Sequence, residues 1–185
     1  MEALIISIGV ITLAEIGDKT QLLAFILAAQ FKKPLPIILG IFAATLINHC
    51  LAGLIGIWIT TLLKPNILRW LLAISFILMA IWTLIPDEIE QDEKKISKYL
   101  GVFGATFITF FLSEMGDKTQ IATIALTAHY NSPILVITGS TLGMLLADLP
   151  AVYFGNLFSH KIPMKIIHII AACTFVIIGL VTLLF

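Results

Sequence analysis

Two nearly identical stretches, LAEIGDKTQ at residues 13–21 and LSEMGDKTQ at residues 112–120, decide the fold class of this sequence. Each stretch sets two acids and a lysine inside a long apolar segment. A shift of the numbering by 99 residues superimposes them without a gap, and a polar motif repeated in register indicates an internal repeat. The same shift also aligns Pro34 with Pro133, Gly40 with Gly139 and Gly56 with Gly155.

The composition of the surrounding chain is that of a membrane protein. Of its 185 residues, 59% are hydrophobic and only 12% are charged, and the mean hydropathy is +1.07. A soluble domain carries about 25% charged residues, so lipid must be the solvent for much of this apolar surface. The formal net charge is zero, so we expect no nucleic-acid partner. The lipid bilayer is an expected partner.

Six apolar segments are long enough to cross a membrane. A hydrocarbon core about 30 Å thick requires roughly 20 helical residues. The segments show no period-2 alternation, which favours helices over a β-barrel. The sequence therefore predicts an all-α polytopic membrane protein with six transmembrane helices, near residues 3–29, 36–62, 67–85, 101–128, 134–158 and 164–185.

The two motif copies divide the chain into two repeats of three spans each. Residues 1–85 form repeat 1, residues 101–185 form repeat 2, and a linker at 86–100, first acidic and then basic, joins them. Because three is an odd number, the second copy must enter the membrane upside down. Inverted repeats place a binding site near the midplane, between the two halves.

Basic residues in the short loops predict the orientation, because cytoplasmic loops carry the excess of lysine and arginine. We expect the linker 86–100 in the cytoplasm and both termini outside. The N-terminus lacks the basic segment of a signal peptide, so the first segment should remain as a span. The cytoplasmic side would hold Lys32, Lys33, Lys94, Lys95, Lys98, Lys161 and Lys165, and the other side Lys64 and Arg69.

The first predicted span, 3–29, carries charges near its middle. Each of Glu15, Asp18 and Lys19 costs about 2.5–3.5 kcal/mol there, so partners or a function must compensate. On one continuous helix, Glu15, Asp18 and Gln21 would share a face because they are three residues apart.

The second copy offers the same face through Glu114, Asp117 and Gln120. If the two faces meet, they supply four carboxylates and two amide oxygens, a set of hard ligands that suits Mn²⁺, Ca²⁺ or Mg²⁺. Gly17 and Gly116 permit a kink or a short unwound stretch, which would free backbone carbonyls as further ligands.

The motif charges also suggest proton exchange. Four motif acids against two motif lysines, Lys19 and Lys118, leave a net charge of −2. One divalent cation neutralises this charge, and so do two protons, which buried carboxylates of like charge hold readily. Metal and protons would then compete for one site, as M²⁺/H⁺ antiport requires. The metal would be the substrate and H⁺ the counter-ion, with no cofactor.

A purely structural role is the alternative for these charges. Glu15 and Lys19 stand in the favoured i,i+4 order and could pair on one helix, as could Glu114 and Lys118. The aspartates would then hold the two halves together. Candidates for a secondary role at the site are Lys19, Thr20, Lys118, Thr119, Asn48, His49 and Asp148, the last of which aligns with His49 under the shift.

The paired E-x-G-D-K-T motifs, Glu15–Thr20 and Glu114–Thr119, resemble those of the Mn²⁺/Ca²⁺:H⁺ antiporter family, also called the transmembrane-protein-165-like family, which includes bacterial Mne-type manganese exporters. The resemblance covers essentially the whole chain. It implies cation/proton exchange, with the motif acids as metal ligands: Glu15, Asp18, Glu114 and Asp117. The lack of an N-terminal targeting extension looks like a prokaryotic member, for which the resemblance implies manganese efflux across the inner membrane.

Two other functions compete with metal transport. A small two-repeat membrane protein could export organic solutes, but the compact acidic motif disfavours a substrate with a carboxylate. An intramembrane aspartyl protease would require G-x-G-D, and Glu15 and Glu114 replace its first glycine. No Walker motif is present to couple ATP. The preference for Mn²⁺ over Ca²⁺ and assembly into homo-oligomers remain open.

Overall fold

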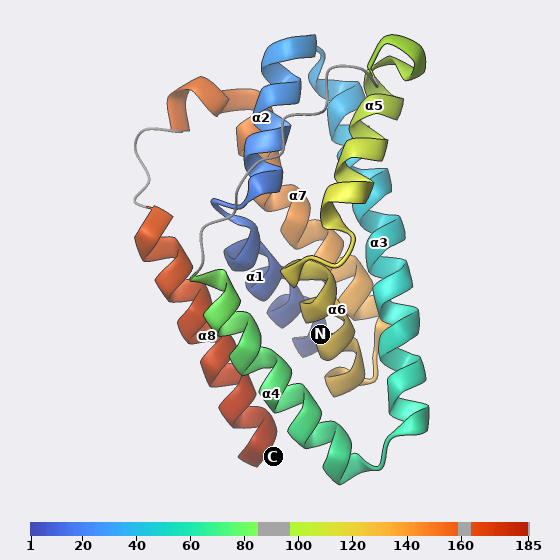
Figure 1. The fold of residues 1–185 in the computed structure, drawn as a ribbon, viewed down its shortest axis with the longest axis vertical. Helices are drawn as coiled ribbons and strands as arrows, with labels where there is room; N and C mark the ends of the chain where they lie inside the picture. The colour runs from blue at the N-terminus through green and yellow to red at the C-terminus, as the bar shows by residue number, and fades with distance from the viewer. Residues whose placement is uncertain (85–96, 159–163, 185) are drawn as a thin grey trace.

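The structure, a computed structural model, describes residues 1–84, 97–158 and 164–184. All regular structure in these ranges is helical, which confirms the all-α prediction (Figure 1). Most of the predicted linker 86–100 lies outside the described residues. The helices are α1 (Glu2–Glu15), α2 (Lys19–Phe31), α3 (Pro34–Leu62), α4 (Pro65–Thr83), α5 (Ser97–Glu114), α6 (Lys118–Tyr130), α7 (Pro133–Phe158) and α8 (Met164–Leu184).

Within the described residues, three helices are long and apolar enough to cross a membrane: α3, α4 and the Pro133–Tyr153 part of α7. The stretches Leu100–Glu114 and Ile169–Leu184 are shorter apolar helices. Large apolar side chains face outward along them, with Trp58 62% and Ile177 60% exposed. Since water would not solvate so apolar a surface, the chain is an integral membrane protein.

The spans predicted over 3–29 and 101–128 are not continuous helices, and each is interrupted where Gly17 and Gly116 were expected to permit a kink or a short unwound stretch. Each of these segments is two helices, α1 with α2 and α5 with α6, separated by a short break inside the motif. Gly17 and Gly116 adopt φ values of 87° and 77°, a left-handed region that is costly for residues with a Cβ. Such a residue ends a helix, and a new one begins two positions later.

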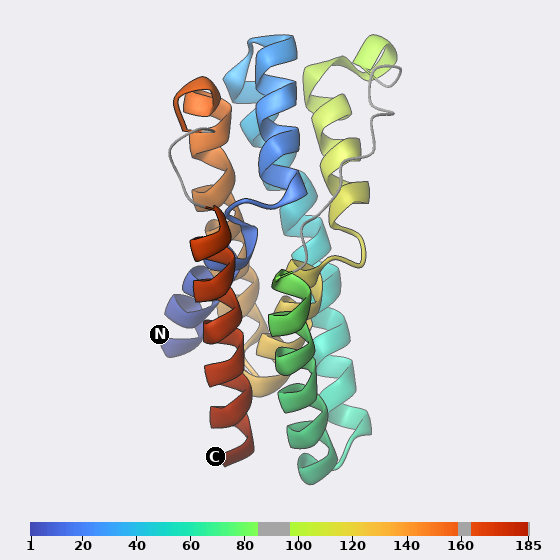
Figure 2. The ribbon, with the colours of Figure 1, turned by 60° about the vertical axis from the view of Figure 1, so that its left-hand side comes forward.

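The helix bounds repeat with the same shift of 99 as the sequence. The helices α2 and α6 begin at Lys19 and Lys118, and α3 and α7 begin at Pro34 and Pro133. The corresponding segments run in opposite directions. Along the long axis, α1–α2 ascends and α5–α6 descends (Figures 1 and 2).

Small residues let corresponding helices approach closely. The helix α1 packs along α7, and α5 packs in the corresponding way along α3. A Cβ at Gly139 would lie 2.6 Å from the Leu4 carbonyl oxygen, and one at the matching Gly40 would lie 2.8 Å from the Thr106 Cβ. Glycine is therefore required at both crossings, as is common between membrane helices.

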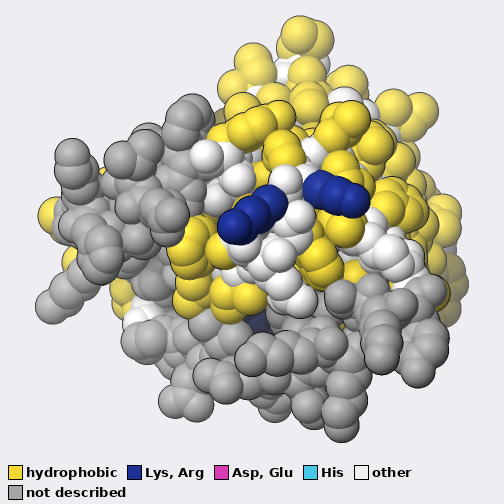
Figure 3. All heavy atoms as spheres, turned by 90° about the horizontal axis from the view of Figure 1, so that it is seen from above, with side chains coloured by type: hydrophobic (Ala, Val, Ile, Leu, Met, Phe, Trp, Pro, Cys, Tyr) yellow, Lys and Arg dark blue, Asp and Glu magenta, His cyan; other side chains and the backbone are white. Residues whose placement is uncertain are grey.

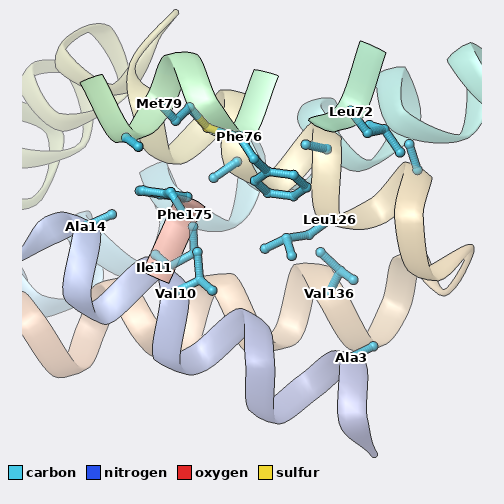
Figure 4. Close-up of a cluster of buried hydrophobic side chains, with 14 of the residues drawn as sticks. Ala3, Val10, Ile11, Ala14, Leu72, Phe76, Met79, Leu126, Val136 and Phe175 are labelled. Carbon is cyan, nitrogen blue, oxygen red and sulfur yellow. The ribbon is translucent and has the colours of Figure 1, made fainter. Parts of the chain in front are cut away.

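The pair α4–α8 departs from this symmetry. It covers α1 and α6, and the apolar cluster between them includes Phe76 and Phe175, which correspond under the shift and stack with centroids 6.5 Å apart (Figure 4). The matching cluster of α2, α3, α5 and α7 contains no α4 or α8 residue in the described ranges. There, Leu22 and Ile26 of α2 remain exposed. The α4–α8 pair thus covers only one half of the molecule.

Candidate metal site

The two helix breaks are built in the same way. Asp18 and Asp117 adopt extended backbone and cap α2 and α6, each accepting a hydrogen bond through Oδ1 from the next residue's N–H at 2.7 Å. The amide oxygens of Gln21 and Gln120 accept from the Gly17 and Gly116 N–H groups at 3.0 and 2.7 Å. In each motif, side chains of the motif itself therefore accept hydrogen bonds from backbone N–H groups at the helix break.

This arrangement corrects the predicted face of Glu15, Asp18 and Gln21 on one continuous helix. The glutamine turns back to the break, and its Nε2 donates to the Ala147 carbonyl oxygen of α7 at 2.8 Å. The amide oxygens proposed as metal ligands are engaged with backbone N–H groups in this conformation.

The lysines join the two motifs. Lys118 Nζ lies 2.9 Å from Asp18 Oδ2, and Lys19 Nζ lies 3.4 Å from Asp117 Oδ2. In the described ranges, each lysine pairs with the aspartate of the other copy, and no Glu–Lys ion pair within a motif is found. The two motifs therefore contact each other through these lysines and aspartates.

The two glutamates lie buried beside these pairs. Glu15 is 0% exposed, and neither carboxylate oxygen has a hydrogen-bond partner within the described part of the chain. Glu114 is 2% exposed and accepts through Oε2 from the Thr119 hydroxyl at 2.6 Å. That contact is a feature that the motif spacing did not predict. The matching hydroxyl of Thr20 has no partner among the described residues.

Asp148 of α7 belongs to the same buried region. It is 0% exposed, and both carboxylate oxygens lack a hydrogen-bond partner in the described ranges. Glu15 and Glu114 each experience the negative charge of Asp148, and Asp148 experiences that of Asp18. The predicted secondary residue thus lies within electrostatic range of both motifs.

The two polar residues of α3 make contacts of their own. Asn48 donates through Nδ2 to the Phe111 carbonyl oxygen at 3.1 Å. The His49 Nδ1 atom lies 3.4 Å from the Thr141 hydroxyl, a partner that the sequence did not indicate. Both side chains are buried, and they fasten α3 to α5 and α7.

The converging acids do not form a finished cage in this conformation. Among the described residues, no three His, Cys, Asp or Glu side chains stand close enough to hold one metal ion. Both lysine ammonium groups lie against aspartate oxygens that would otherwise face a cation. The ligand set of Glu15, Asp18, Glu114, Asp117 and the glutamines therefore stays a prediction.

Known proteins are similar to this chain over most or all of its length. A family model described as "Divalent cation/proton antiporter GDT1" matches residues 3–91 and 102–185. A Vibrio cholerae protein named "Putative manganese exporter" is 48% identical over 100% of this chain and 92% of its own.

Plant proteins are more distant. "GDT1-like protein 1, chloroplastic" of Oryza sativa subsp. japonica is 31% identical over 92% of this chain and 58% of its own. "Protein PAM71-homolog, chloroplastic" of Arabidopsis thaliana is 28% identical over 94% of this chain and 57% of its own. No solved structure matches. Because the family model covers both repeats, the chain belongs to the GDT1 family, a family of cation transporters and not of enzymes.

Proposed function

We propose that this protein exports Mn²⁺ in exchange for protons and binds the metal between its two motifs. The observation that carries the proposal is the pair of ion pairs Lys118–Asp18 and Lys19–Asp117, which join the motifs in a buried region. A membrane protein retains such charges where an ion or proton passes. The glutamates beside them supply further hard oxygen atoms.

Manganese is the favoured substrate for two reasons. Carboxylate oxygens suit Mn²⁺ and other hard divalent cations, and the Vibrio relative carries the name of a manganese exporter. Calcium accepts the same ligands, so transport of Ca²⁺ is a further expected activity.

Proton coupling follows from the charge of the motifs. The four motif acids and two motif lysines leave a charge of −2, and the buried Asp148 makes it −3 when it is ionised, so the region needs a divalent ion or protons to approach neutrality. A buried site that must remain close to neutral binds either the metal or the protons. Exchange of one for the other is antiport.

The architecture that we propose is six spans in two inverted repeats, 1–85 and 101–185. The matching helix bounds and opposite chain directions support it. At the end seen in Figure 3, where α2 meets α3, Lys32 and Lys33 are exposed. By the excess of basic residues this end faces the cytoplasm, together with the linker 86–100, and both termini lie outside.

The one-sided packing of α4–α8 fits alternating access to a central site. In this conformation the pair packs on the half that contains α1 and α6, and among the described residues it contributes none to the apolar cluster of α2, α3, α5 and α7. We infer that the α4–α8 pair moves toward α2 and α5 during transport. The site would then open alternately toward the two sides of the membrane.

Flux in proteoliposomes tests the proposal. We expect the purified protein to carry Mn²⁺, to be driven by an imposed pH gradient, and to move protons in the opposite direction. Glu15→Gln should abolish flux, whereas Glu2→Gln, at the exposed start of α1, should not change it. Flux that ignores the pH gradient would refute the proton half. Transport of amino acids by the protein, unaffected by added Mn²⁺, would favour the organic-solute exporter.

A further inference from the structure

The buried acids near the motifs outnumber the cations that pair with them. Five carboxylates are 3% exposed or less, and the two motif lysines pair with Asp18 and Asp117. No ion pair to a lysine, arginine or histidine is found for the other three in the described ranges. These three are Glu15, Glu114 and Asp148.

Asp148 is the member of this trio that lies outside the motifs. Its carboxylate is fully buried in α7, and the described structure gives neither oxygen a hydrogen bond. A carboxylate has four lone-pair sites and needs a donor, a proton or a cation when it leaves water. Both oxygens of this buried acid are therefore open to a proton or a cation in the described structure.

The fold holds Asp148 toward the first motif. The residue before it, Ala147, accepts a hydrogen bond through its carbonyl oxygen from Gln21 Nε2 at 2.8 Å. The same glutamine holds the Gly17 N–H at the helix break. One side chain thus ties this turn of α7 to the break. The negative charge of Asp148 acts on Glu15 and Glu114, which come from opposite copies of the motif.

The trio is not symmetric. Under the shift of 99, Asp148 corresponds to His49, a buried imidazole whose Nδ1 atom faces the Thr141 hydroxyl at 3.4 Å. Beyond the two aspartates paired with lysines, the described parts of the repeats therefore supply two equivalent glutamates and one acid, Asp148, without an acidic counterpart.

We propose that Asp148 is a direct carboxylate ligand of the transported divalent cation, together with Glu15 and Glu114. Asp18 and Asp117 then serve chiefly to cap the helix breaks and to pair with the lysines. Three carboxylates, completed by hydroxyls or water, suit an octahedral hard cation. Because no three acids are within ligating distance in this conformation, the side chains draw together when the ion binds.

The inference rests on the proposed function, and Mn²⁺ binding to the purified protein tests both. Affinity is measured by electron paramagnetic resonance in detergent, and the number of bound waters by pulsed electron–nuclear double resonance. Asp148→Ala removes every ligating oxygen of this side chain, so it should weaken binding on the order of 100-fold and add a water to the bound ion. The matched control is His49→Gln, at the equivalent position of the other repeat, which should keep affinity within about threefold of wild type.

A second variant guards against misfolding. Asp148→Glu retains a carboxylate and should bind Mn²⁺ more tightly than Asp148→Ala, with both proteins monodisperse by size exclusion. Wild-type affinity and unchanged water number in Asp148→Ala would overturn the ligand role of Asp148 while leaving the proposed function intact. Absence of Mn²⁺ binding in wild type and His49→Gln would overturn both.

Discussion

The ammonium nitrogen of Lys118 lies 2.9 Å from the Asp18 carboxylate, across the boundary between the two sequence repeats. The symmetry-related pair, Lys19 with Asp117, spans 3.4 Å. Their surroundings differ, because the Lys118 side chain is 1% exposed and that of Lys19 is 29% exposed. The two equivalent ion pairs should therefore contribute unequally to stability, because water screens the Lys19 pair more than the Lys118 pair.

Lys118→Met should destabilise the protein more than Lys19→Met. Removal of one partner from a buried ion pair costs about 3–5 kcal/mol, because the remaining charge loses its compensation. The Lys19 pair is partly hydrated, so its loss should cost less. Thermal unfolding of the two variants in the same detergent measures the difference.

A double variant is the control for this effect. Lys118→Met combined with Asp18→Asn removes both charges and should recover part of the stability that Lys118→Met loses. Equal loss in Lys118→Met and Lys19→Met would contradict the unequal burial of the two pairs.

The sequence alone predicted the features that repeat. The register of the two motifs predicted two equivalent sets of helices, and their bounds do correspond, as at Lys19 and Lys118. The burial of the motif acids could also be predicted, because the apolar residues on both sides of each motif place it inside the membrane. Helical content was predictable because lipid leaves the backbone few alternatives.

The helix breaks and the partners of the lysines were not predictable from spacing. Gly17 permits either a kinked helix or a full break, and the break forms because Asp18 caps α2 and Gln21 binds the freed N–H. Lys19 stands at i+4 from Glu15, which fits an intrahelical pair equally well. Lys19 pairs with Asp117 because the packing of the two halves brings that aspartate within 3.4 Å of its ammonium group.

Gly116→Ala should destabilise the break by about 1–2 kcal/mol through backbone strain alone. Gly116 has φ 77°, and a Cβ there would meet nothing within 4 Å, so steric contact contributes nothing. The matched control is Gly9→Ala, which also has open space but lies inside α1 and should be neutral or slightly stabilising. The unfolding temperatures of both variants test this prediction. An equal drop in unfolding temperature for Gly9→Ala would show that backbone strain at position 116 is not the cause.

Gly139→Ala should weaken the α1–α7 crossing. The added Cβ would lie 2.6 Å from the Leu4 carbonyl oxygen and 2.9 Å from the Ser7 Cβ, so the helices must separate. Overpacking of this kind costs about 1–3 kcal/mol. We expect a lower yield of monodisperse protein by fluorescence-detected size exclusion. Gly9→Ala again serves as the control, and an unchanged yield for Gly139→Ala would show that the crossing tolerates a wider spacing.

Cross-linking of α4 to α6 should stop transport. Leu72 and Leu126 are buried in the same cluster beneath the α4–α8 pair (Figure 4). With Cys50 and Cys173 replaced by alanine, the pair Leu72→Cys and Leu126→Cys should react with a short bifunctional thiol reagent. Because the link holds α4 against the α1–α6 half, Mn²⁺ flux should fall at least about tenfold, the effect of a barrier raised by 1.4 kcal/mol. Reduction of a cleavable reagent should restore it.

A cross-link between α4 and α8 is the control for damage by the reagent. It joins the two helices that are proposed to move together. A Cβ at Gly179 of α8 would lie 3.2 Å from the Ala73 carbonyl oxygen of α4, so Ala73→Cys with Gly179→Cys joins the two helices where they already touch. This link should leave flux near the level of the untreated protein, because α4 and α8 would still move together. Full transport by the cross-linked α4–α6 variant would show that α4 need not leave α6.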